Sequence, residues 1–276
     1  MRYAICNEMF EGWEFGRVCA TARALGYTGL EVAPFTLASS ITDVSSETRR
    51  QLRKQAETEG VQIIGLHWLL AKTTGFQLTS PDPAVRKRTG EYLAELARAA
   101  ADLGGDILVL GSPAQRKIPQ GHTREEAEAF AIDSIRHCLP VLAETNVKLC
   151  LEPLTTAETD FMVSAAETVG IIDQLAHPNV KLHLDVKAMS TESQSIPNVI
   201  RANARHTYHF HANDPTDPPR YGPGFGSTDF RPILQALADT AYTGWVSVEV
   251  FHYAPDPETI AKRAIECLQN AIHGIQ

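Results

Sequence analysis

Four segments in the second half of the chain each carry, near the end of a short apolar run, one residue that can bind a cation or exchange a proton. These residues are Glu152, Asp185, His211 and Glu249. Alternate residues of a β-strand point to opposite faces. In the segment 245–251 the alternating valines therefore predict one apolar face and leave Glu249 on the other. The same alternation predicts that the other three side chains also point away from the apolar face of their segments.

Three carboxylates and one imidazole would converge if these four segments were neighbouring strands. Buried like charges repel one another, and one or more of the carboxyl groups would stay protonated unless a cation were present. One divalent metal ion resolves this repulsion. An oxygen-rich set with one nitrogen favours manganese, magnesium or cobalt over a structural zinc site. The alternative is that the four side chains fill the interior of the fold and hydrogen-bond to one another.

The elements that must position these residues follow a regular pattern along the chain. Short β-rich runs alternate with longer amphipathic segments, and the alternation occurs eight times without a break. Eight strand-helix units favour a single closed (β/α)8 TIM barrel over an open doubly wound sheet, because no G-x-G-x-x-G motif follows the first strand. The active site of such a barrel forms at the carboxyl ends of its strands. The expected strands are residues 2–8, 28–34, 61–69, 106–111, 147–153, 180–186, 207–212 and 245–251.

The clearest helical patterns cover residues 83–103 and 123–145. The second begins with a Thr-x-x-Glu capping signal formed by Thr123 and Glu126. The Pro- and Gly-rich segment 214–226 lies between the seventh strand and its helix, where a loop on the active face is expected. This loop does not divide the chain into separate domains.

The composition excludes several classes of protein. The chain has 25 Lys and Arg against 33 Asp and Glu, a formal net charge of −8, and no basic run. This balance argues against nucleic acid and anionic membranes as partners. No apolar segment approaches the roughly 18 residues of a membrane span, and no leader sequence is recognisable, so a cytoplasmic protein is expected. The five cysteines contain no C-x-x-C pair, which favours buried thiols in a reducing compartment.

The motifs at the expected strand ends resemble those of a known family, the xylose-isomerase-like TIM barrels. This family includes sugar phosphate isomerases/epimerases and ketose 3-epimerases such as D-tagatose 3-epimerase. The resemblance covers essentially the whole chain and implies one domain over residues 1–276. The motifs that carry it are L-E-P-L at 151–154, H-L-D at 183–185, H-F-H-A-N-D at 209–214, G-P-G-F-G-S-T-D-F at 222–230 and W-V-S-V-E-V-F at 245–251.

The resemblance implies a function for the four residues described above. In the epimerase members the matching residues bind one divalent cation, which implies Glu152, Asp185, His211 and Glu249 as ligands, with Mn²⁺ favoured and Mg²⁺, Co²⁺ or Zn²⁺ as alternatives. The two glutamates are also implied to act as an acid/base pair: one removes a proton from the carbon next to a carbonyl, and the other returns it. The metal stabilises the enediolate that forms between these steps. The implied enzyme is an isomerase, acting either as a sugar epimerase or as an aldose-ketose isomerase.

The substrate is expected to be a small sugar or keto-polyol. Glu158 matches a family glutamate that hydrogen-bonds either the acid/base residue or the substrate, and Arg220 matches a family arginine that holds substrate oxygens. Strand parity shared with Ile63 and Gly65 predicts that His67 points into the barrel, where we expect it to contact the substrate. Homo-oligomers are common in the family, and we expect one here.

Several other polar positions near the strand ends are expected to matter less. His183 and His209 are expected to lie deeper as supporting groups. Many family members carry a substrate-contacting histidine three residues after the sixth-strand aspartate, where this chain has Ala188. The preceding Lys187 either replaces that donor or is an exposed charge. Trp68 is expected to face the helices.

Three other functions fit parts of the pattern. A metal-dependent dehydratase or lyase of the inosose or dehydroshikimate type would expel a hydroxyl from the same enediolate. An endonuclease of the endonuclease IV type shares the barrel but needs three zincs and further histidines at positions where this chain has Gly111 or Ser112 and Ala188. A barrel kept as a non-catalytic scaffold or partner subunit would lack metal uptake.

Overall fold

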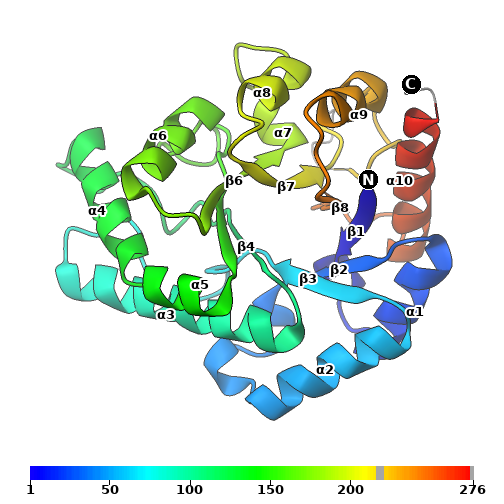
Figure 1. Cartoon of the computed structure of the whole chain (residues 1–276), viewed down its shortest axis with the longest axis horizontal. Helices are drawn as coiled ribbons and strands as arrows, with labels where there is room; N and C mark the ends of the chain where they lie inside the picture. Colours follow the sequence, from blue (N-terminus) through cyan, green and yellow to red (C-terminus); the bar gives the residue numbers. More distant parts are fainter. Residues whose placement is uncertain (216–220, 274–276) are drawn as a thin grey trace.

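Eight parallel strands close into a barrel in the computed structural model, which describes residues 1–215 and 221–273. Each strand pairs with the next along the chain, and β8 returns to β1 with Trp245 opposite Arg2. The expectation of a single (β/α)8 barrel is therefore confirmed (Figure 1). The strands are β1 Arg2–Cys6, β2 Gly29–Val32, β3 Gln62–Leu66, β4 Ile107–Leu110, β5 Lys148–Leu151, β6 Val180–Asp185, β7 Thr207–Ala212 and β8 Trp245–Val248.

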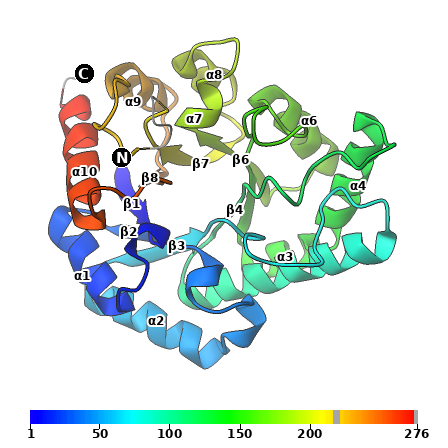
Figure 2. The ribbon, with the colours of Figure 1, turned by 180° about the vertical axis from the view of Figure 1, so that it is seen from behind.

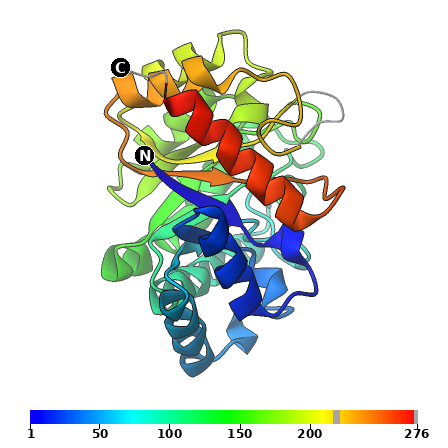
Figure 3. The ribbon, with the colours of Figure 1, turned by 90° about the vertical axis from the view of Figure 1, so that its right-hand side faces the viewer.

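The helices surround the strands as an outer ring, which is visible from both ends of the barrel (Figures 1 and 2). From the side, α10 runs across the wall next to α1, where the last helix meets the first (Figure 3). The helices are α1 Phe15–Leu25, α2 Ser46–Thr58, α3 Pro83–Leu103, α4 Arg124–Arg136, α5 Leu139–Thr145, α6 Ala165–Leu175, α7 Val186–Met189, α8 Ile196–Ala202, α9 Phe230–Asp239 and α10 Pro257–Ile272, with 3-10 turns η1 Glu8–Phe10, η2 Pro34–Thr36 and η3 Ile41–Asp43. None of the helices in the described ranges has the length and apolar character needed to cross a bilayer.

The helix expected over residues 123–145 is two helices, α4 and α5. The capping box of Thr123 and Glu126 forms as expected. The continuous helix is wrong because Pro140, in the first turn of α5, has no N–H to donate to the preceding turn, so a new helix begins there. Most expected strands also extend beyond the observed ones at their carboxyl ends. The chain stops pairing with the neighbouring strand there, because the loops at that end of the barrel begin.

The apolar core lies in two places, inside the lower barrel and between the strands and the helices. The lower interior is filled by one small cluster, and the outward-facing strand residues join a larger one with the helices. The upper interior instead holds buried polar side chains from several strands. The apolar layers thus leave the carboxyl ends of the strands as the place where charged groups gather. The interior cluster is Ala4, Ile64, Ile107, Val109, Cys150 and Trp245.

Candidate active site

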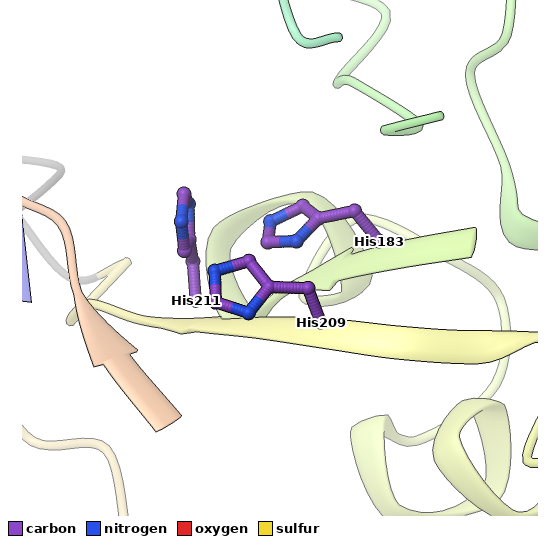
Figure 4. Close-up of side chains that lie close together, drawn as sticks. All are labelled: His183, His209 and His211. Carbon is purple, nitrogen blue, oxygen red and sulfur yellow. The ribbon is translucent and has the colours of Figure 1, made fainter. Parts of the chain in front are cut away.

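Four buried side chains converge at the carboxyl ends of β5, β6 and β7. Glu152, His183, Asp185 and His211 each offer one ligand atom, and these atoms all lie within 4.8 Å of one another. The rings of His183 and His211 are 4.1 Å apart between centroids and nearly perpendicular. Figure 4 shows these two rings gathered with that of His209 between neighbouring strands. Three of the four predicted ligands are therefore close together, and His183 joins them.

Local structure holds two of these carboxylates in place. Asp185 ends β6 and caps α7, because its Oδ1 accepts a hydrogen bond from Ala188 N, and its Oδ2 accepts a 2.6 Å bond from Asn213 Nδ2. Glu152 follows β5 directly and lies against Gly111, where a Cβ atom would come within 1.6 Å of Glu152 Oε2. A glycine is therefore required at position 111 for the carboxylate to occupy its place.

Glu249 lies immediately after β8 and beside this group. Its Oε2 is 3.3 Å from His211 Nδ1, and its Oε1 accepts a 2.9 Å hydrogen bond from Trp68 Nε1. The carboxylate is 3% exposed. Although burial raises the pKa of Glu249, the charge and hydrogen bond of His211 outweigh it, so the pKa is lowered from its ordinary value. Glu249 therefore approaches the cluster through the imidazole of His211.

The electrostatics of the group fit a bound cation. Burial, together with the charges of Glu249 and Asp185, raises the pKa of Glu152 well above its ordinary value, and burial and Glu249 raise the pKa of Asp185 to about 6. Burial and the neighbouring histidines lower the pKa of His183, which keeps its ring neutral. Both ring nitrogens of His183 lack a hydrogen-bond partner among the described residues. Crowded carboxylates and an unpartnered neutral imidazole form the donor set that a divalent ion would satisfy.

Beneath the cluster, Glu31 holds two of the histidines. Its Oε2 lies 2.8 Å from His209 Nε2 and 3.0 Å from His211 Nε2, and all three side chains are fully buried. Burial raises the pKa of Glu31, but the two histidines outweigh it and hold the pKa well below its ordinary value. A carboxylate on one ring nitrogen orients the other toward a metal. Glu31 therefore orients the His211 ring so that its Nδ1 faces the carboxyl ends of the strands.

A cavity of about 250 Å³ opens above these ligands. Glu152, Asp185 and Glu249 line its floor, and Trp68 and Phe251 form an aromatic wall in which the two rings stack 5.1 Å apart. This cavity is enclosed on one side by aromatic carbon and on the other by carboxylates. Such a lining suits a small polyhydroxylated molecule.

Glu158 and Lys187 also line the cavity and form an ion pair with each other. Glu158 Oε2 accepts hydrogen bonds from Thr155 N and Thr155 Oγ1 at 3.2 and 2.9 Å. The Lys187 side chain is 13% exposed. Of the two interpretations of Lys187, the structure therefore contradicts the exposed charge. Glu158 borders the cavity, and its contact with substrate stays a prediction.

His67 points into the barrel, but for a reason that strand parity misses. A register shift between β2 and β3 pairs Leu30 with Ile63 and Glu31 with Gly65, so Ile63 packs toward the helices while Ile64 turns inward. The His67 ring is completely buried, and its Nε2 lies 2.8 Å from Glu8 Oε2. Its contact with substrate stays a prediction. Arg220, the other predicted substrate residue, lies outside the described residues.

The expectation that Trp68 faces the helices is wrong. The strand ends at Leu66, and Trp68 adopts a left-handed backbone with a φ of 53°. Alternation applies only while the backbone stays extended, so the indole turns into the cavity instead. No sequence motif marks this turn.

Sequence reasoning also missed Arg116, which is 1% exposed. Its guanidinium donates to the main-chain carbonyls of Leu110, Ser112 (3.3 Å) and Glu152 (2.5 Å), at the ends of β4 and β5. Burial lowers the pKa of Arg116 to about 10, which leaves it charged at neutral pH. In the sequence this arginine resembles an ordinary loop residue. Its partners are main-chain carbonyl oxygens, and no pattern of residue types predicts which of these it will contact.

Known proteins resemble this chain along most of its length. The family model described as xylose isomerase-like TIM barrel matches residues 19–271. The D-psicose 3-epimerase of Ruminiclostridium cellulolyticum is 29% identical over 231 residues, which are 82% of this chain and 75% of that protein. The D-psicose 3-epimerase of Agrobacterium fabrum is 28% identical over 242 residues, 86% of this chain and 80% of that protein.

Solved structures share the fold. A D-psicose 3-epimerase crystallised with D-fructose superposes with a TM-score of 0.82 at 24% identity, covering 99% of this chain and 97% of its own. A structure of L-ribulose 3-epimerase gives a TM-score of 0.83 at 21% identity, covering 99% and 96%. At this level of sequence identity, the similarity shows that these proteins share the closed-barrel fold.

Proposed function

The chain belongs to the xylose isomerase-like TIM barrel family, and from this premise we propose that it is a divalent-metal-dependent sugar isomerase or epimerase. The observation that carries the proposal is the buried group of Glu152, His183, Asp185 and His211, whose two carboxylates line the floor of the cavity. The relatives of this chain are named as epimerases of ketoses, which supports the same reaction class. The substrate is a small sugar or keto-polyol, and the reaction moves a proton on a carbon next to a carbonyl group.

A divalent metal would be held by Glu152, Asp185, His211 and Glu249, with His183 available as a further nitrogen donor. When bound, the cation supplies positive charge that stabilises the negative charge developing on the substrate oxygens as a proton leaves. Oxygen-rich ligation favours Mn²⁺. Asn213 and Glu31 keep Asp185 and His211 oriented for this role.

Glu152 and Glu249 act as the acid/base pair. Glu152 follows β5 and Glu249 follows β8, so the strands β6 and β7 separate them and the two carboxylates reach the cavity from different sides. A substrate carbon between them can lose a proton to one carboxylate, and the planar enediolate that results can regain a proton from the other. Return to the opposite face of the same carbon gives epimerisation, and return to the neighbouring carbon gives aldose-ketose isomerisation.

Glu158 and Lys187 line the cavity and bind substrate hydroxyl groups, and Trp68 and Phe251 exclude water from one side. His67 and Arg220 are further substrate contacts in this proposal. We propose further that the protein is cytoplasmic, that residues 1–276 form a single domain and that the chain assembles into a homo-oligomer.

Deuterium incorporation in D₂O, followed by mass spectrometry, tests this function. A panel of free and phosphorylated ketoses, inososes and hydroxypyruvate is incubated with manganese or with a chelator. Metal-dependent exchange in one substrate class is the expected result, and loss of exchange in Glu152→Gln and Glu249→Gln would assign the acid/base pair. Loss of water from the product would indicate a dehydratase instead. Protein that takes up no manganese would overturn the proposal and favour a non-catalytic scaffold.

A further inference from the structure

A second cavity of about 660 Å³ adjoins the cavity above the metal ligands. Trp68 and Lys72 line both cavities, so the two spaces meet at this pair of side chains. The second cavity lies between the segment that follows β1 and the turn that follows β2, and Tyr253 borders it from the loop after β8. Trp68 and Lys72 are therefore a wall that the two cavities share, and a molecule that reaches both would lie across this pair.

Aromatic rings form much of the wall of the second cavity. Trp13 packs edge-on against Phe10 at 5.3 Å, and Phe35 lies 5.8 Å from Trp68 between ring centroids. Tyr253, which is 38% exposed, adds a further ring. Flat apolar faces provide large contact area at low entropic cost for ring-shaped ligands whose hydroxyl groups point outward.

Carboxylates and amides supply the polar part of the wall. Glu8, Glu11, Glu14 and Asn7 line the cavity. Glu8 is 3% exposed, its Oε2 is held by His67, and its Oε1 has no hydrogen-bond partner among the described residues. A buried carboxylate oxygen without a partner needs a donor. A sugar hydroxyl is such a donor.

The charge of the wall favours a neutral ligand over an anionic one. Lys72 is the single cationic residue that lines the second cavity within the described part of the chain, and its Nζ lies 4.1 Å from the centre of the Phe35 ring. Glu11 and Glu14 oppose this lysine, while Glu8 is paired with His67 and Arg17 lies over the Trp13 ring. The wall therefore has no excess of cations to bind a phosphate or carboxylate group, whereas a neutral polyol would meet acceptors for its hydroxyl groups.

We propose that the substrate of this enzyme is a neutral glycosylated sugar, with the reacting unit above the metal ligands and a second sugar ring in the 660 Å³ cavity. This inference rests on the proposed function and names its substrate class. Trp13 and Tyr253 contact the second ring, while Trp68 lies between the two units and also donates its hydrogen bond to Glu249.

The test compares D-fructose with three keto-disaccharides in which the ketose carries a pyranose: lactulose, leucrose and isomaltulose. Manganese-loaded protein is incubated with each sugar in D₂O, and kcat/KM for deuterium exchange is measured by mass spectrometry. We expect at least one disaccharide to exceed D-fructose by about tenfold or more, because the second ring adds binding energy from outside the reacting centre.

Three variants separate the second cavity from a general effect. Trp13→Ala and Tyr253→Ala should each lower the ratio of disaccharide to D-fructose kcat/KM about tenfold. The matched control is Phe130→Ala, which removes an aromatic ring on α4 that packs on Arg86 and His122 away from both cavities. The control should leave the ratio unchanged.

Exchange of D-fructose with exclusion of all three disaccharides would overturn the inference, as would a ratio unaffected by Trp13→Ala and Tyr253→Ala. If none of these four sugars exchanges, the wider panel and manganese uptake described above decide the proposed function, and titration calorimetry decides the question of the second cavity. Disaccharide binding that is tighter than D-fructose binding and weakened in Trp13→Ala supports the cavity as a sugar site. Equal or absent binding refutes it.

Discussion

Replacing Trp68 with phenylalanine removes a single interaction of the proposed acid/base residue Glu249. The indole Nε1 donates a 2.9 Å hydrogen bond to Glu249 Oε1, while Oε2 keeps its 3.3 Å contact with His211. Phenylalanine retains a ring that can stack on Phe251. The variant therefore leaves one oxygen of a buried carboxylate without its donor and preserves the apolar wall.

The magnitude follows from the charge and burial of Glu249. A hydrogen bond to a charged group contributes about 1.5–3 kcal/mol. If that energy orients the carboxylate during proton transfer, kcat/KM falls about ten- to 150-fold. Loss of the donor also disfavours the ionised form of Glu249, so the pKa of Glu249 rises and the acidic limb of the kcat/KM profile moves to higher pH.

The assay is the pH dependence of deuterium exchange, with manganese affinity measured in parallel by calorimetry. Trp245→Phe is the matched control, because it makes the same chemical change in the apolar cluster at the bottom of the barrel. We expect Trp68→Phe to keep its metal and lose activity, and the control to keep both. Full activity in Trp68→Phe, or loss of manganese in place of loss of rate, would refute the role of this hydrogen bond.

Three further predictions concern the metal group and its support. Manganese at 100 times its dissociation constant should stabilise the protein by about 2.7 kcal/mol in thermal unfolding, and Asp185→Asn should abolish this effect. Because the pKa of Asp185 is about 6, manganese competes with a proton there, and its affinity measured by calorimetry should fall as the pH is lowered from 7.5 to 5.5. Constant affinity over that range would contradict the prediction. Arg116→Met removes the side-chain donor of three main-chain carbonyls, of which only Leu110 O keeps a second donor, Glu152 N at 3.3 Å, among the described hydrogen bonds. It should lower the free energy of unfolding in urea by about 3 kcal/mol, with a smaller loss in Arg116→Lys; equal losses would show that guanidinium geometry is unimportant. Gly111→Ala places a Cβ 1.6 Å from Glu152 Oε2 and should weaken manganese binding at least about tenfold, whereas Gly170→Ala, which meets nothing within 4 Å, should bind manganese normally.

The residues that bear on function in the later strands could be predicted from alternation alone. In β8 the valines pack outward and Ser247 points inward, and in β7 Phe210 packs outward while His209 and His211 are buried among the interior polar groups. A strand turns its side chains by a fixed period, so the pattern of apolar residues determines which side faces inward as long as the strand is regular. The barrel itself follows from eight such units in order.

The first half of the chain shows where this reasoning stops. Parity assigns Ile63 to the interior, but the register shift between β2 and β3 turns Ile64 inward instead. Trp68 leaves the extended conformation after β3 and turns toward Glu249. Neither departure has a sequence signal, because each depends on how neighbouring strands pair and how loops pack above them.

The sequence by itself determined the barrel, its inward-facing carboxylates and histidine, and the divalent-metal chemistry that they suggest. Only the tertiary structure decided that His183 joins the ligand group, that Glu31 holds His211 from below, and that Trp68 contacts Glu249, 181 residues away. The physical reason is the range of the interactions. Alternation and helix capping are local properties of the chain, whereas a hydrogen bond between distant residues exists only after the barrel has closed and placed its strands side by side.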